Sequence, residues 1–275
     1  MNKINTAIEK IRKAERLALE YQDYGFYLAF SGGKDSQVVY ELCKMAGVKF
    51  RAYYNVTTID YPEVVRFIRE YYPDVVFLRP KMNFYKLIIK YKSLPMINRR
   101  YCCKELKEYS GKNAVVLTGI RRAESNKRAK RNELELYGHK YSDTLDQFNI
   151  DKEKQIVCVN GNDKILFSPI INWEDKDVWN FLRTKKMKYC QLYDEGYRRV
   201  GCIFCPNSSP KTKKLDRIRY PKVEQAIKQS IKILCNEGKL PGFKNNVDEI
   251  FDWWISNKSY KVYKAEKLNY IIKFD

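Results

Sequence analysis

Short apolar runs alternate with helical patterns over the first 120 residues of the chain. Each apolar run ends at polar or glycine residues, and a stretch with apolar side chains at helical spacing follows it. The expected strands span residues 27–30, 50–56, 75–78 and 114–120, and the expected helices span 3–21, 62–71 and 84–91. This alternation predicts an α/β fold, a Rossmann-like parallel twisted sheet sandwiched by helices. With 275 residues, the chain is long enough to bury such a core.

The loop after the first expected strand, residues 31–36, reads Ser-Gly-Gly-Lys-Asp-Ser and leads into a helical pattern. The two glycines let backbone amides approach an anion, because no Cβ stands in the way. Lys34 adds positive charge, and the helix directs unpaired N–H groups at the same point. Asp35 either caps that helix or helps to hold Mg²⁺. An ordinary glycine turn is the structural alternative, and the spacing excludes the usual P-loop, Gly-x4-Gly-Lys-Ser/Thr.

Two arginines, Arg121 and Arg122, follow directly after the expected strand 114–120. In open parallel sheets, ligands bind beyond the carboxyl ends of the strands, so these arginines should lie near the loop 31–36. A guanidinium grips phosphate or sulfate through two N–H groups, and Glu124 could fix its orientation. The neighbouring lysines are expected to be solvated.

The cysteines form two pairs, Cys102-Cys103 and Cys202-x-x-Cys205. In a reducing compartment such pairs favour metal binding over disulfides. The second pair, with a glycine before it and a proline after it, is typical of a metal knuckle. Adjacent cysteines suit the separate iron corners of a [4Fe-4S] cluster better than one zinc tetrahedron, although zinc and unmetallated thiols stay open. Cys190 is the alternative to Cys102 as fourth ligand, and the remaining cysteines are expected in the core.

The chain is basic, with 53 Lys and Arg against 33 Asp and Glu. This balance favours phosphate-rich partners, but it does not choose between a small nucleotide and a polynucleotide. We find no apolar stretch of membrane-spanning length and no signal-peptide pattern at the start, so we expect a cytoplasmic protein with no membrane contact.

The remaining chain is expected to contain fewer strands. Residues 122–154 are polar with little periodicity and are predicted to be mobile beside the site. Residues 155–159 and 164–168 form a plausible hairpin, and a helix is expected over 173–182. Beyond Pro210 the pattern is mostly helical, notably over 223–234 and 247–255, with a break at 238–242. We therefore expect a nucleotide-binding domain with the cysteine site over 1–210 and a helical C-terminal extension over 211–275.

Several of these motifs together resemble the PAPS reductase family of the PP-loop ATP pyrophosphatase (adenine-nucleotide alpha-hydrolase) superfamily, iron-sulfur type. The loop 31–36 is similar to the PP-loop signature, and residues 119–125 with Arg128 are similar to the family's Gly-x-Arg-x-x-Glu-Ser segment. Asp60 stands where the family has an Asp-Thr segment, although the threonines precede it here. Residues 169–179 resemble the family's Pro-Leu-x-x-Trp...Asp-Val-Trp stretch.

The resemblance implies specific roles for the matching residues. Lys34, Asp35 and Arg121 are the implied catalytic residues, and the four paired cysteines are the implied ligands of a [4Fe-4S] cluster. The residues implied to bind ATP, or PAPS or APS, are Ser31, Gly32, Gly33, Lys34, Asp35, Ser36, Asp60, Gly119, Arg121, Arg122, Glu124, Ser125 and Arg128.

The family's sulfate-reducing members carry a nucleophilic cysteine in a Glu-Cys-Gly-x-His segment near the C-terminus, and nothing here matches it. We therefore expect an enzyme that adenylates an acceptor with ATP, releases pyrophosphate and lets sulfur displace AMP. The acceptor could be a nucleic acid, and a sulfur-donor protein is an expected partner. One alternative is a PAPS or APS reductase that uses Cys235 or a thiol from a reductant protein. Another is a non-catalytic nucleotide sensor or nucleic-acid-binding protein.

Overall fold

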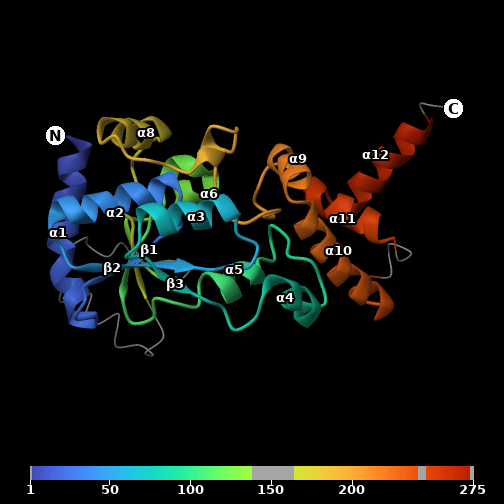
Figure 1. Ribbon diagram of the computed structural model, residues 1–275, viewed down its shortest axis with the longest axis horizontal. Helices are drawn as coiled ribbons and strands as arrows, with labels where there is room; N and C mark the ends of the chain where they lie inside the picture. The colour runs from blue at the N-terminus through green and yellow to red at the C-terminus, as the bar shows by residue number, and fades with distance from the viewer. Residues whose placement is uncertain (1, 138–163, 241–245, 273–275) are drawn as a thin grey trace. The chain divides into compact units, whose positions relative to one another are not determined.

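The structure is a computed structural model that describes residues 2–137, 164–240 and 246–272 (Figure 1). The chain forms two compact units. The first unit contains residues 1–56, 62–79 and 109–200, and the second contains residues 57–61, 80–108 and 201–275. These are units of packing, each described by itself below, and the expected domain boundary at residue 210 stays a prediction.

The first unit is built on a six-stranded sheet in the order β3-β2-β1-β4-β6-β5. Five strands run parallel, and β5 at the edge pairs antiparallel with β6. Because β1 lies between β2 and β4, the chain order reverses beside β1, which is where α/β sheets bind ligands. The strands are β1 (Phe26–Ala29), β2 (Phe50–Asn55), β3 (Val76–Leu78), β4 (Val115–Leu117), β5 (Leu134–Leu136) and β6 (Ile165–Phe167).

Helices of the first unit cover this sheet. The longest, α1 (Lys3–Tyr21), buries one face whose apolar side chains recur every three or four residues, Ala7, Ile11, Ala14 and Ala18 among them. It packs against α2 (Lys34–Ala46), which in turn packs against α8 (Asp175–Thr184). The remaining helical segments are α3 (Pro62–Tyr71), η1 (Arg122–Glu124), α6 (Asn126–Ala129) and η2 (Gln191–Tyr193).

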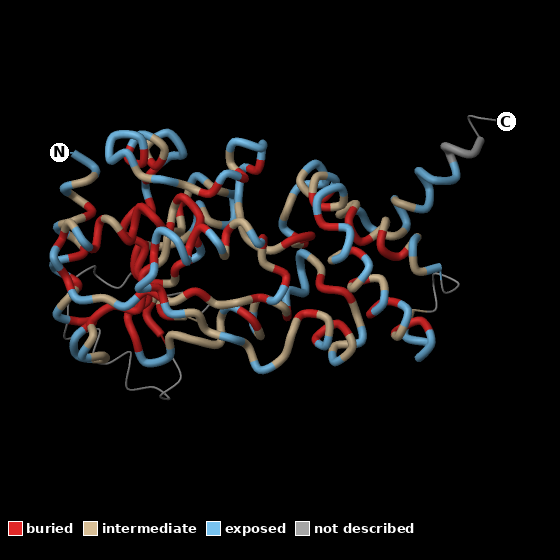
Figure 2. Tube along the Cα trace, in the orientation of Figure 1, coloured by how far each residue is buried: buried red, intermediate tan, exposed pale blue. Residues whose placement is uncertain are grey.

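The core of the first unit lies along the strands, as the buried positions in Figure 2 show. Phe26 and Leu28 of β1 and Val115 of β4 are fully buried. On the opposite side of β1, the ring of Tyr27 stacks on that of Tyr53 at 4.2 Å. Both faces of β1 are thus covered, which explains why its sequence is a continuous apolar run.

The second unit is helical and surrounds an aromatic core. Its helix α10 packs against α4 and α11, and α9 contacts both α10 and α11. Phe204, Phe251 and Trp254 are buried at the centre, together with Tyr61 from the short segment 57–61. The helices are α4 (Phe84–Tyr91), α5 (Tyr101–Leu106), α9 (Pro210–Arg219), α10 (Pro221–Asn236), α11 (Val247–Ser256) and α12 (Tyr260–Ile272).

Most of the expected elements are present, and the α/β fold class is confirmed. The helices expected over 3–21, 62–71 and 84–91 are confirmed at those bounds. The expectation for residues 122–154 is wrong in its first part, because η1, α6 and β5 lie within 122–136. Residues 155–159 lie outside the described residues, and residues 165–167 pair with β4 and β5 as an inner strand. Within the described ranges, no helix has both the length and the apolar character that a membrane crossing requires.

Gly25 offers a test of how β1 is placed. Gly25 has φ +77°, and a Cβ on it would lie 2.2 Å from the backbone oxygen of Lys49. That oxygen accepts a hydrogen bond from the amide of Phe26, at the start of the pairing between β1 and β2. Gly47 has a similar φ, +72°, but open space around it. We predict that Gly47→Ala costs about 1–2 kcal/mol of unfolding free energy from backbone strain alone. Gly25→Ala should cost a further 1–3 kcal/mol or so, because backbone must shift.

Urea denaturation followed by circular dichroism measures both variants against the unsubstituted protein. Equal losses for Gly25→Ala and Gly47→Ala would contradict the close approach of Gly25 to Lys49.

Candidate functional site

The loop between β1 and α2 is tied together by its own serines. The hydroxyl of Ser36 donates to the carbonyl of Gly33 at 2.8 Å and accepts from the amide of Ser31 at 3.2 Å. Gly32 has φ +70°, and a Cβ there would lie within 2.9 Å of the side chains of Val64 and Ile68. The loop therefore has one compact conformation that only glycine permits at position 32.

The loop ends at the N-terminus of α2, where Gly33 is the N-cap and provides no side-chain cap. The amide of Lys34 donates to the hydroxyl of Tyr193 at 3.0 Å, and that hydroxyl would lie only 3.3 Å from a Cβ on Gly33. Burial raises the pKa of Tyr193, so the hydroxyl stays protonated. Gly33 has no side chain to cap this 13-residue helix, and the Tyr193 hydroxyl takes the amide of Lys34 alone, so the positive end of the helix dipole favours a bound anion.

Four charged side chains form a network beside this helix start. The ammonium of Lys34 contacts Asp35 at 3.2 Å and Asp175 at 3.0 Å. The guanidinium of Arg121 contacts the same two carboxylates, Asp35 at 2.7 Å and Asp175 at 3.0 Å. Lys34 is 4% exposed and the Arg121 side chain 3%, whereas the Asp175 side chain is 63% exposed. Two cations with almost no access to water are thus balanced by two carboxylates.

Asp175 is the most exposed member of this network. Burial alone would raise its pKa, but Lys34 and Arg121 outweigh that effect and hold the pKa below its ordinary value. Its stabilising contribution is therefore present at neutral pH and is lost as the pH falls through that lowered pKa.

The sequence predicted three members of this network and missed two contributors to the site. Lys34, Asp35 and Arg121 meet as expected, but Asp175 and Tyr193 were not singled out. Asp175 lies in the first turn of α8, where an acidic residue is ordinarily read as a partner of the helix dipole. Tyr193 carries no local signal at all, because only the tertiary fold brings it to the loop.

Residues after β4 form a second basic group in the same unit. Glu124 accepts from the amide of Arg121 at 3.0 Å and forms an ion pair with Arg128. It also lies 3.7 Å from the guanidinium of Arg199, and the Ser125 hydroxyl accepts from the amide of Arg128. Glu124 thus orients the Arg128 side chain and the Arg121 backbone, and Asp35 and Asp175 orient the Arg121 guanidinium.

Arg122 and Gly119 have different surroundings. The guanidinium of Arg122 donates to the carbonyl of Arg131 at 2.9 Å and to the side chain of Asn172 at 2.6 Å. A Cβ on Gly119 would lie 2.9 Å from the backbone of Asp35. Gly119 therefore lets the chain after β4 approach the start of α2, while Arg122 braces the segment that follows.

The second unit contains the four paired cysteines. Cys102 lies in the first turn of α5. A hydrogen bond to Cys103 and burial raise its pKa, and the charges of Cys202 and Cys205 raise it further. That same hydrogen bond lowers the pKa of Cys103 to about 6, with help from the nearby Lys107. Among the described residues, no group of three or more His, Cys, Asp or Glu side chains is arranged to hold a metal ion.

A buried carboxylate holds the turn between Cys202 and Cys205. Asp216 of α9 accepts from the amide of Phe204 at 2.9 Å and from the hydroxyl of Tyr61 at 2.9 Å. Phe204 has φ +54°, a conformation that needs such support in a bulky residue. The segment 57–61 also pairs with the turn, since the amide of Ile203 donates to the carbonyl of Ile59 at 2.8 Å.

Asp60 and Cys190 differ from the expected pattern in their partners. Asp60 accepts from both the amide and the hydroxyl of Thr57 at 2.7 Å, and Cys202 lies 3.5 Å from that hydroxyl. Asp60 therefore shapes the turn beside the thiols. Cys190 belongs to the first unit, where it is buried beside Tyr193.

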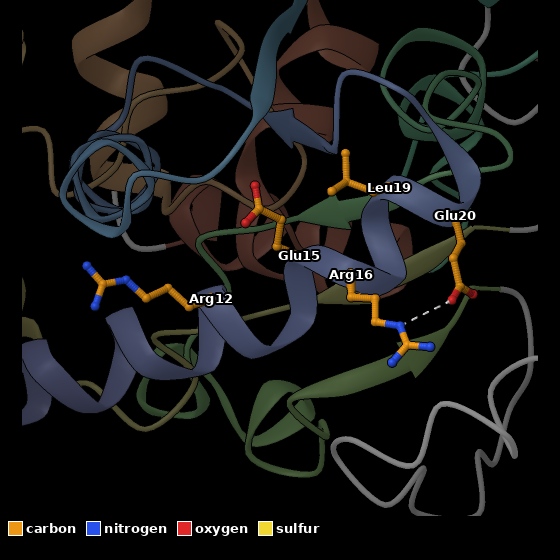
Figure 3. A pocket seen from close by; sticks show the side chains of 5 residues that line it. All are labelled: Arg12, Glu15, Arg16, Leu19 and Glu20. Carbon is orange, nitrogen blue, oxygen red and sulfur yellow. Dashed lines mark ion pairs between the residues drawn. The ribbon is translucent and has the colours of Figure 1, made fainter.

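One surface hollow lies along α1 (Figure 3). All of its lining residues come from that single helix, and its polar groups are already engaged. Arg12 donates to the carbonyl of Ala46, Glu15 accepts from the amide of Lys49, and Arg16 pairs with Glu20 at 3.9 Å. The lining residues are Arg12, Glu15, Arg16, Leu19 and Glu20. This hollow offers no convergent polar groups for a ligand.

Similar proteins include enzymes that act on adenine nucleotides. An uncharacterized protein of Methanocaldococcus jannaschii is 30% identical over 67% of this chain, but the match spans only 42% of that protein's length. A probable FAD synthase of Schizosaccharomyces pombe is 28% identical, with 73% of this chain and 68% of that protein covered. An adenosine 5′-phosphosulfate reductase of Staphylococcus epidermidis is 23% identical, with 70% and 75% covered.

A solved structure, the FMN adenylyltransferase of Candida glabrata with FAD and inorganic pyrophosphate, aligns with a TM-score of 0.48 and 14% identity, covering 73% of this chain and 62% of that one. The family model for the phosphoadenosine phosphosulfate reductase domain matches residues 25–208, which include the loop 31–36 and all four paired cysteines. The chain belongs to the phosphoadenosine phosphosulfate reductase domain family.

Proposed function

We propose that this protein is an ATP-dependent adenylating enzyme that activates an acceptor for sulfur transfer, with a nucleic acid as the acceptor. The observation that carries the proposal is the uncapped start of α2 beside Lys34 and Arg121. Such a site binds a polyphosphate chain through backbone amides and two cations. Similarity to a probable FAD synthase supports ATP, because FAD synthesis joins an adenylate to a second molecule.

In this proposal each group has one task. The loop amides bind the β- and γ-phosphates, and Lys34 and Arg121 stabilise the charge that develops when an acceptor oxygen attacks the α-phosphorus. The bond to pyrophosphate breaks, and pyrophosphate leaves. A sulfur nucleophile from a donor protein then attacks the activated acceptor carbon, and AMP departs with the acceptor oxygen. Carboxylate oxygens suit Mg²⁺, so the solvent-facing Asp175 would help to hold the ion that accompanies the phosphates.

The thiols of the second unit fit an iron–sulfur cluster in their chemistry. A cluster needs thiolates, and the hydrogen bond from Cys102 lowers the pKa of Cys103, whereas the pKa values of Cys102 and Cys202 are raised, so binding would have to displace their protons. The charges of Cys202, Cys205 and Cys103 contribute to raising the pKa of Lys107. In turn, the ammonium of Lys107 would offset part of the negative charge of these thiolates. Cys102, Cys103, Cys202 and Cys205 would hold the cluster. When bound, it would supply electron transfer, and zinc is the competing occupant.

A second candidate is reduction of PAPS or APS, favoured by similarity to an APS reductase. That reaction needs a thiolate to attack the sulfate sulfur. Cys235 suits this role poorly, because it is buried and burial raises its pKa. A reductase would therefore take its thiol from a partner protein. Sulfite release from labelled PAPS without ATP, in the presence of a thiol reductant, would favour this candidate.

Lys34→Ala tests the nucleotide site. We predict that ATP affinity falls by about tenfold or more, equivalent to about 1.4 kcal/mol, because a charge-assisted contact to phosphate is lost. Isothermal titration calorimetry with ATP and with PAPS measures the effect and ranks the two nucleotides. Lys44→Ala, at the other end of α2 and exposed, is the matched control. Unchanged affinity for both nucleotides in Lys34→Ala would refute the proposed site.

Asp175→Asn tests whether a carboxylate competes with the ligand. Without Mg²⁺, we predict that ATP binds severalfold more tightly, because Lys34 and Arg121 lose a competing anion worth about 1–3 kcal/mol. With Mg²⁺ the gain should shrink or reverse. Asp177→Asn is the control, since Asp177 lies on the same helix and pairs with Lys3. Tighter binding in both variants would assign the effect to the general charge of α8.

Anaerobic purification with iron, acid-labile sulfide and zinc analysis tests the thiol group. We predict about four iron atoms and four sulfides per chain, as expected for a [4Fe-4S] cluster. Loss of both is expected in Cys202→Ser and Cys205→Ser, while Cys43→Ser, a buried core cysteine of the first unit, should retain them. Stoichiometric zinc without iron would instead assign a structural zinc site.

A further inference from the structure

We infer that the turn between α4 and α5, residues 95–100, is a contact surface for a single-stranded nucleic acid. The inference rests on the proposed function, since it names where the acceptor of that reaction binds the chain. Its basis is the charge, shape and neighbourhood of this turn within the second unit.

The segment that contains the turn is strongly basic, and most of its cationic side chains are exposed to solvent. Residues 80–108 include eight Lys and Arg against two glutamates. Lys107 lies against the charges of the cysteines. The other seven cations are exposed to solvent, namely Lys81, Lys86, Lys90, Lys92, Arg99, Arg100 and Lys104. Glu105 is already engaged, with Lys90 at 3.4 Å and with the hydroxyl of Tyr91. Most of the positive charge is therefore left for a partner, and a phosphate backbone supplies charge of the opposite sign.

The turn is held in one conformation. Met96 and Arg99 exchange two backbone hydrogen bonds, at 3.1 and 3.2 Å. The carbonyl of Pro95 accepts from the indole of the buried Trp254 at 2.7 Å. At the base of the turn, the rings of Tyr91 and Tyr101 stack at 4.1 Å and 11°. A preorganised turn loses little conformational entropy when it binds a partner.

The tip of the turn combines an apolar side chain with two arginines. Ile97 is 54% exposed, and Asn98, Arg99 and Arg100, which follow it in sequence, are also exposed. Apolar side chains flanked by arginines are used to separate or stack on bases while the guanidinium groups hold phosphates.

The position of the turn links it to the thiols. Arg100 is the N-cap of α5, two residues before Cys102. A nucleic-acid strand held by Arg99 and Arg100 would therefore run next to the thiol pair of the same unit.

The double variant Arg99→Glu/Arg100→Glu tests the inference in the full chain. Fluorescence anisotropy with labelled single-stranded RNA and DNA of one sequence measures Kd between low and moderate salt. We expect the Kd to rise at least about tenfold, and the slope of log K against log salt to fall in magnitude by about 1.4, as for two lost phosphate contacts. Ile97→Ala should weaken binding without changing that slope. The RNA and DNA arms identify the preferred strand.

Arg16→Glu/Arg66→Glu is the matched control, because it makes the same charge change at two exposed arginines of the first unit. If the two double variants bind equally, or if an acidic peptide displaces the strand as well as unlabelled nucleic acid does, the inference is wrong. Thermal melting checks that both variants fold. ATP titration of the unsubstituted protein separates the two proposals. Absence of nucleic-acid binding with ATP binding intact would refute the contact surface at the turn and not the nucleotide site. Nucleic-acid binding without ATP binding would refute the nucleotide site and not the contact surface.

Discussion

The arrangement of the first unit depends on the pairing of Lys34 and Arg121 with Asp35 and Asp175. Two cations with almost no water contact are tolerable only when carboxylates stand beside them, since an unpaired buried charge costs several kcal/mol or so. The network joins the start of α2, the segment after β4 and the start of α8. Asp175 is the most exposed of the four side chains, at 63% against 21% for Asp35.

The sheet order explains why these three segments meet. β1 lies between β2 and β4, so the loop after β1 and the segment after β4 leave the sheet at the same edge. Their separation is small because Gly119 has no side chain to hold the backbone of Asp35 away. The anion site is thus a consequence of topology, a glycine and a helix start, and the charged side chains adjust it.

Local signals in the sequence predicted most of the first unit, and the misses share a cause. The alternation of apolar runs with helical patterns predicted β1 to β4 and α1 to α4, because these elements have buried faces that span several residues. The helix α5 has six residues and buries only Tyr101 and Leu106, which is too little for a period to emerge. The contacts of Asp175, Tyr193 and Asp216 are tertiary. The local sequence around Asp175 is compatible with an ordinary helix cap, that around Tyr193 with an aromatic core residue, and that around Asp216 with a solvated acid. Spacing alone predicted the cysteine pairs, but not that Asp216 of α9 would hold the turn between Cys202 and Cys205.

The distribution of thiols limits the chemistry that the chain can perform by itself. Cys43, Cys190 and Cys235 are buried, and burial raises the pKa of Cys43 and Cys235, so neither is poised to act as a nucleophile. Among the described residues, the thiol with a lowered pKa is Cys103, which belongs to the paired cysteines. If those four thiolates hold a cluster, this group is committed to metal, and the sulfur or the reducing thiol must come from another molecule. An adenylating role places no such demand on the chain's own cysteines, because its nucleophile is the acceptor. The proposed adenylation therefore needs no thiol from this chain, whereas sulfate reduction would need one from a partner.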